Sequence, residues 1–405
     1  MSHDLQRPDR TGTAPGRPLI LLLALACGIG VTNVYFPQAI VPLVAGGLRV
    51  TPSAASAVVT AAQFGYAAGI FLLVPLGDRL THRRLIVTLL TITGLGLVVA
   101  GTAPTLPVLV AASALIGAAT VVPQIIIPMT AGLVPADRNG AVTGTLLSGL
   151  IGGILLARAF SGILGQWLGW RAPYLVAAAA TALLALILAM ALPTTTPSSR
   201  ERYPALLATS LRLLRTEPDL RRSALYQALI FAGFTAAWTS LALLVTGPDY
   251  GLGASAIGLI ALVGAVSMFA SPIAGRYADR RGPDPVNLVC MVAVIGAAAL
   301  LITGSLGHAV GLIGLTAGML VLDVAMQSGQ VANQARIFAL RSEVRSRLNT
   351  AYMTCAFLGG SIGSWLGVRI YSTFGWTGVC LLVAALAALA LTRHLVGRRS
   401  DLCTY

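Results

Sequence analysis

One carboxylate in this sequence lies deep inside an apolar run. Eleven of the thirteen acidic residues fall in polar segments that carry many arginines, and Asp249 lies in a separate short break. Only Asp323 stands within an uninterrupted apolar stretch, Leu320–Ala325. A carboxylate there is costly unless it faces water, pairs with a cation or binds a proton. Asp323 is therefore a candidate proton-coupling residue, and a structural carboxylate capped by a neighbouring helix is the alternative.

Glutamines follow Asp323 on the same helical face. Gln327, Gln330 and Gln334 come four, seven and eleven residues later, and Arg336 ends this polar stripe. Polar or amphipathic side chains in other apolar runs extend the set of candidate substrate-binding residues. The full set is Asn33, Tyr35, Gln38, Gln124, Tyr226, Gln227, Trp238, Gln327 and Gln330. Helix–helix hydrogen bonding is the alternative role for each of them.

A single arginine, Arg158, also lies within an apolar run. It could pair with an acid such as Asp323 across a cavity, attract an anionic substrate, or extend its guanidinium to the membrane interface. We expect the last of these, or a structural role.

The elements that must position these residues are transmembrane helices. The chain has 405 residues, of which 56% are hydrophobic and 10% charged, with a mean hydropathy of +0.84. A bilayer core of about 30 Å takes roughly 20 apolar residues per helix. Twelve apolar segments fit, at 18–47, 53–76, 85–103, 106–132, 140–164, 171–192, 222–247, 254–274, 286–305, 309–334, 348–372 and 376–396.

The arginines indicate the orientation. Of 27 basic residues, all arginine, 23 fall on one side if the loops alternate, and only Arg49, Arg171 and Arg369 border the other side. The positive-inside rule then predicts that both termini are cytoplasmic. The net charge of +14 is accordingly a topology signal, and nucleic-acid binding is not expected.

Residues for enzymatic chemistry are lacking in the sequence. The chain has no lysine and so no Walker sequence, which excludes ATP-driven pumping by this chain alone. The five cysteines have no CxxC spacing, and His3, His82, His308 and His394 fall in termini or loops. We therefore expect no enzyme, metal or cofactor.

The two halves resemble each other. Gly149, Gly152 and Gly153 correspond to Gly359, Gly360 and Gly363, and Gly169-Trp170 corresponds to Gly375-Trp376. Repeated features in two six-span halves of equal orientation indicate a parallel duplication. The predicted organisation is a cytoplasmic tail (1–17), a six-helix bundle (18–192), a cytoplasmic linker (193–221), a second six-helix bundle (222–396) and a second tail (397–405).

These features resemble the major facilitator superfamily along nearly the whole chain. The family's loop signature, Gly-x-x-x-Asp-Arg-x-Gly-Arg-Arg, is matched in the second half by Gly275, Asp279, Arg280 and Gly282, and in the first half by Asp78, Arg79 and Arg83. The segment 33–38 resembles a first-span pattern of efflux-type members, and the glycines of span five resemble the signature of proton-driven antiporters.

The resemblance implies an all-α membrane protein with two pseudo-symmetric six-helix bundles that work by alternating access. Asp78, Arg79, Arg83, Gly275, Asp279 and Arg280 would form a cytoplasmic gate. We expect proton-coupled efflux of a small organic molecule by a monomer in a bacterial inner membrane, in contact with lipid. The alternatives are uptake or facilitated diffusion of a sugar or other metabolite without proton coupling, and a non-transporting membrane receptor or scaffold.

Overall fold

The computed structural model describes residues 16–134, 136–193, 201–264, 266–340 and 344–402, and every regular element in these ranges is a helix. The elements are α1 (Arg17–Tyr35), α2 (Pro37–Leu48), α3 (Pro52–Ala55), α4 (Ala57–Leu73), η1 (Val74–Asp78), α5 (His82–Gly101), α6 (Leu106–Ala119), α7 (Val122–Leu133), α8 (Ala136–Leu168), α9 (Arg171–Ala191), α10 (Tyr203–Thr216), α11 (Pro218–Thr246), α12 (Ala254–Gly264), α13 (Ser267–Arg281), α14 (Pro283–Ile302), η2 (Thr303–Leu306), α15 (His308–Leu340) and α16 (Arg345–Leu402).

The lengths and composition of the described helices are consistent with twelve membrane crossings. Ten segments within the described ranges are long and apolar enough to span a bilayer. One of them, Arg345–Val396, holds two crossings, because Gly375 has a φ of 65° and breaks α16. The remaining crossing combines α12 and α13, each too short alone. The predicted all-helical fold is confirmed.

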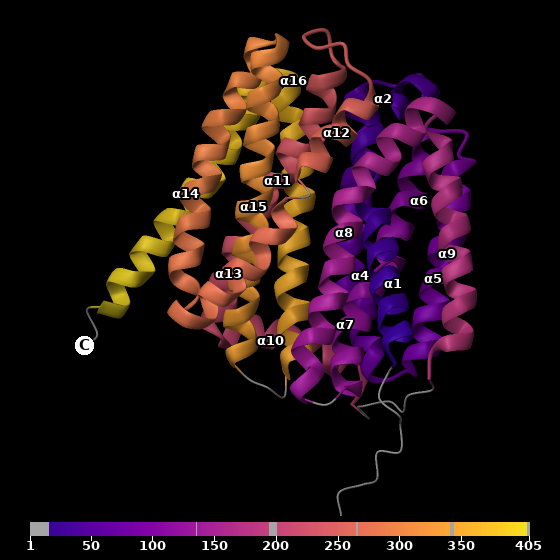
Figure 1. Cartoon of the computed structure of the whole chain (residues 1–405), viewed down its shortest axis with the longest axis vertical. Coiled ribbons are helices and arrows are strands. Elements are labelled where there is room, and N and C mark those ends of the chain that lie inside the picture. The colour runs from indigo at the N-terminus through magenta and orange to yellow at the C-terminus, as the bar shows by residue number, and fades with distance from the viewer. Residues whose placement is uncertain (1–15, 135, 194–200, 265, 341–343, 403–405) are drawn as a thin grey trace, which may run out of the picture.

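Figure 1 shows two bundles side by side, α1–α9 in indigo to magenta and α11–α16 in orange to yellow. We call them the first and second bundle. The short helix α10 lies at one end of the molecule, near the start of α11, and we call this the linker end. Helices α2 and α12 lie at the opposite end.

Small residues bring one helix pair of each bundle into backbone contact. A Cβ added at Gly153 would overlap the backbone of Gly28, and one at Gly363 would overlap the backbone of Ala232. A threonine hydroxyl adds a hydrogen bond to each of these helix pairs. Thr32 donates to the carbonyl of Gly153 over 3.1 Å. Thr235 donates to the carbonyl of Gly360 over 2.7 Å. The α1–α8 and α11–α16 pairs are thus built alike, as expected for duplicated halves.

The two bundles meet along two seams. Helices α8 and α12 cross through glycine, since a Cβ at Gly162 would overlap the Ala254 carbonyl and one at Gly258 would overlap Ala159. On the other seam, α4 packs against α16, and Thr60 donates to the hydroxyl of Ser364 over 3.3 Å.

Candidate functional site

A small cavity of about 20 Å³ lies between the bundles. Seven helices contribute its lining, from α1, α4, α7 and α8 in the first bundle and from α11, α15 and α16 in the second. The lining consists of apolar, aromatic and amide side chains: Val31, Tyr35, Tyr66, Gln124, Leu150, Ile154, Gln227, Phe231, Met326, Gln327, Gln330, Met353, Ala356 and Phe357. Five of the predicted substrate-binding residues are among them.

The amides of this cavity connect helices by long hydrogen bonds. Gln227 donates to Gln330 over 3.4 Å, which links α11 to α15. Gln124, positioned by Pro123 in the first turn of α7, donates to the Tyr66 hydroxyl over 3.4 Å. Asn349 donates to Gln124 over 3.3 Å and so joins the two bundles. Bonds of this length are weak and can be exchanged for bonds to a ligand.

Asp323 lies at the end of this cavity that is farther from the linker, and its side chain is 2% exposed. Its Oδ1 accepts a hydrogen bond from the indole nitrogen of Trp238 over 3.3 Å. Its Oδ2 has no hydrogen-bond partner among the described residues and faces Gly264, where a Cβ would collide with it. The carboxyl group is thus buried, held on one side only and packed against the broken helix α12–α13.

Arg158 approaches from the first bundle. Its Nε donates to Gln38 over 2.8 Å, and its guanidinium carbon lies 3.9 Å from the centre of the Trp238 ring. Neither terminal nitrogen of Arg158 has a hydrogen-bond partner within the part of the chain that the structure describes. The side chain is 0% exposed, so the prediction that it reaches the membrane interface is wrong. Trp238 contacts both charged groups, which interact electrostatically across the bundle interface.

These residues form a charged layer directly beyond the cavity. On α8, Arg158 follows the lining residue Ile154 by four positions, and on α15, Asp323 precedes Gln327 by four. Four residues of helix rise about 6 Å, one turn. The charged layer, defined as Gln38, Arg158, Trp238 and Asp323, therefore closes the cavity toward the opposite end.

The family model of the major facilitator superfamily matches residues 20–340. The chain belongs to this superfamily. It is accordingly a multi-pass membrane transporter and not an enzyme.

Known proteins of similar sequence or fold align with most of this chain. The Escherichia coli protein YgaY, named as an uncharacterized transporter, is 36% identical over 374 residues, which cover 92% of this chain and 94% of that protein. A chloramphenicol resistance protein of Streptomyces lividans is 31% identical over 288 residues, 70% of this chain and 72% of its own. The crystal structure of the nucleoside transporter NupG has the same fold, with a TM-score of 0.74, 14% identity and coverage of 93% and 98%.

Four of the nine predicted substrate-binding residues lie outside the cavity lining. Asn33 donates its amide to Thr120 over 3.3 Å, and Thr120 in turn donates to the Gly30 carbonyl. Tyr226 accepts from Arg222 over 2.8 Å at the linker end of α11. Asn33 is thus held between helices and Tyr226 within its own helix, and the binding role of both stays a prediction. Gln38 and Trp238 belong to the charged layer and not to the lining.

The predicted gate residues lie at the linker end but differ between the bundles. Asp78 ends η1 and is half-buried, while Arg79 beside it is exposed. Arg83 lies in the first turn of α5 and is half-buried. In α13, Gly275 is half-buried, and Asp279 and Arg280 are exposed. Asp279 forms no ion pair with another described residue, so the expected latch at this position is not formed here.

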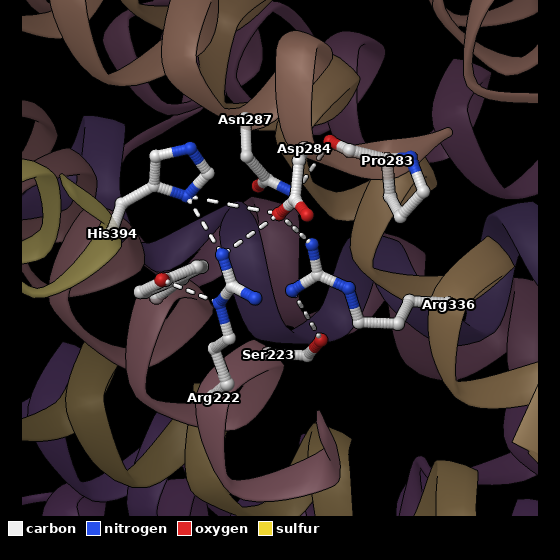
Figure 2. A network of polar contacts seen from close by, with 8 residues as sticks. Arg222, Ser223, Pro283, Asp284, Asn287, Arg336 and His394 are labelled. Atoms are coloured by element: carbon white, nitrogen blue, oxygen red, sulfur yellow. Dashed lines mark hydrogen bonds and ion pairs between the residues drawn. The ribbon is translucent and has the colours of Figure 1, made fainter. Parts of the chain in front are cut away.

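The ionic cluster of the second bundle combines Arg336, the end of the polar stripe, with charged residues that the sequence did not single out as a site. In Figure 2, Asp284 of α14 lies between two arginines from other helices. Its Oδ1 accepts from Arg222 of α11 over 3.0 Å and also from Arg336 of α15. His394 of α16 lies 3.8 Å from the same oxygen and is buried, so its predicted position in a terminus or loop is wrong. We call these four residues the Asp284 cluster; it joins four helices at the linker end.

Proposed function

We propose that this transporter exports a small organic molecule in exchange for protons, with Asp323 as the proton-binding group. The observation that carries the proposal is the buried carboxyl of Asp323, with a cation on the opposing bundle. Within the described part of the chain, this carboxyl has one hydrogen-bond donor, and its Oδ2 has none. A buried acid with so few partners can exist in either protonation state, since neither is strongly favoured by its surroundings.

The protonation state of Asp323 would change the attraction between the bundles. When ionised, the carboxylate attracts Arg158 across the interface and favours closure of the opposite end. When protonated, it loses this attraction, and the opposite end can open. A proton arriving from that side would therefore favour the conformation that releases substrate there. This is coupling by differential stabilisation of two states.

The cavity chemistry favours neutral or amphiphilic substrates. None of the residues that line it carries a formal charge, and aromatic and methionine side chains surround a few amides. Apolar walls with a small number of polar groups are typical of small-molecule sites. The name of the chloramphenicol resistance relative supports the same substrate class and supports export as the direction. The excess of arginines at the linker end supports a cytoplasmic position for that end in a bacterial inner membrane. We also propose that the protein acts as a monomer.

Transport in everted membrane vesicles tests the proposal, with chloramphenicol as the first probe. Respiration acidifies the vesicle lumen, and an exporter with this coupling should accumulate the compound there. We expect Asp323→Asn to reduce proton-driven accumulation more than about tenfold, equal to 1.4 kcal/mol of lost driving force. Exchange of labelled for unlabelled chloramphenicol without a gradient should persist, because it requires the cavity and not the proton.

The matched control is Asp249→Asn, the same chemical change in an exposed loop at the opposite end. It should transport like the parent protein. Undiminished proton-driven accumulation by Asp323→Asn would disprove the coupling role. Equal rates in both directions that ignore the gradient would instead identify facilitated diffusion.

A further inference from the structure

A groove of about 450 Å³ opens on the seam between α4 and α16, separate from the central cavity. It lies in the half of the molecule farther from the linker end. Its walls are mostly apolar, and the lining residues are Ser53, Ser56, Ala57, Thr60, Ala61, Phe64, Ala114, Trp365, Val368 and Arg369. Phe64 and Trp365 are 57% and 48% exposed, so their rings face the membrane.

The end of this groove carries a cation that has no counter-ion among the residues the structure describes. The guanidinium carbon of Arg369 lies 4.4 Å from the centre of the Trp365 ring. Arg369 is exposed and forms no ion pair with any carboxylate in the described ranges. Ser53 and Ser56 lie at the start of the same groove. An uncompensated arginine and hydroxyl groups above an apolar channel provide what a phosphate with an attached acyl chain requires.

We propose that the groove binds one glycerophospholipid, with its phosphate at Arg369 and an acyl chain along Phe64 and Trp365. Charge complementarity identifies this occupant, because the bilayer supplies a phosphate at the depth of Arg369 and hydrocarbon at the depth of Phe64. A substrate without a phosphate would leave the arginine unmatched. A soluble peptide would have no access to a surface that faces lipid.

Because of the position of the groove, a lipid bound there affects how the two bundles pack. Thr60 of the groove donates to Ser364, whose hydroxyl is 3.1 Å from that of Thr239 on α11. These hydroxyls link α4, α16 and α11 next to the groove. A lipid wedged outside them contacts both bundles and stabilises the arrangement in which this seam is closed.

Quenching of tryptophan fluorescence by a brominated lipid tests the site. The delipidated full-length protein in detergent is titrated with dibromostearoyl phosphatidylglycerol, and the emission of Trp365 is taken as the difference between the parent and Trp365→Phe. We expect quenching that saturates with a single lipid. Arg369→Gln should raise the midpoint about fivefold, while Arg369→Lys should not. Dibromostearoyl diacylglycerol, which lacks the phosphate, should quench as weakly in the parent as the phospholipid does in Arg369→Gln.

Trp167 provides the matched control for ordinary lipid contact. It is 81% exposed on α8 and is not one of the residues that line the proposed lipid groove. Its emission, isolated with Trp167→Phe, should decline gradually without saturation and should not respond to Arg369→Gln. The proposal is overturned if Trp365 and Trp167 are quenched in parallel, or if Arg369→Gln leaves the midpoint for Trp365 unchanged.

Discussion

Asp323 and Asp284 are aspartates of the same bundle with opposite surroundings. Asp284 is 35% exposed, yet it receives two guanidinium groups and lies near a histidine. Asp323 is 2% exposed, yet among the described residues a single indole is its hydrogen-bond donor and one oxygen has no partner. Asp284, the carboxylate that is more exposed to solvent, is thus also the one with more cationic groups around it.

This difference separates a structural acid from one that can change state. Two guanidinium groups pair with the carboxylate of Asp284, so it acts as a permanent connection among four helices. Asp323 lacks enough partners to fix its charge, and its burial opposes ionisation. Position in the membrane alone does not distinguish the two roles; the number and charge of the neighbours does.

The largest effect on stability is expected from Asp284→Asn. Removal of the charge leaves two guanidiniums next to each other without an anion, which should lower the free energy of unfolding by about 2 kcal/mol. Titration with a denaturing detergent, followed by circular dichroism, measures the change. An Asp284→Asn variant as stable as its parent would show that the Asp284 cluster is not a structural connection.

A smaller effect is expected from Trp238→Phe. This change removes the indole N–H that donates to Asp323 but keeps an aromatic face for Arg158, so the loss should be about 1 kcal/mol. In Asp323→Asn, which retains an acceptor oxygen but no charge, the same substitution should cost less. A double-mutant cycle measures the difference. Coupling as large as that between Asp284 and Arg336 would mean that Asp323, like Asp284, belongs to a permanent structural connection.

The smallest effect is expected from Asp279→Asn. The side chain is exposed at the end of α13 and makes no ion pair with the residues described, so stability should change by less than about 0.5 kcal/mol. The same detergent titration measures it. A loss comparable to that of Asp284→Asn would restore Asp279 to the gate that the sequence motif predicts.

The sequence predicted those features that a single helix defines. Asp323 stands out because it interrupts an apolar run, and Gln327 and Gln330 follow it with helical spacing; both line the cavity. Its donor Trp238 is 85 residues away, and no local pattern connects the two. Asp284 resembles any acid in the first turn of a helix, since its partners Arg222 and Arg336 are 62 and 52 residues distant. Contacts between helices depend on rotation and depth, which hydropathy does not specify.

The glycine crossing of α8 and α12 has a mechanical consequence. Where backbones touch through Gly162 and Gly258, no interlocked side chains oppose rotation of one helix over the other. The α4–α16 seam, by contrast, is joined by hydroxyl groups that must part if it widens. We therefore expect α8 and α12 to act as the fulcrum of the motion, with the larger displacement on the side of α4 and α16.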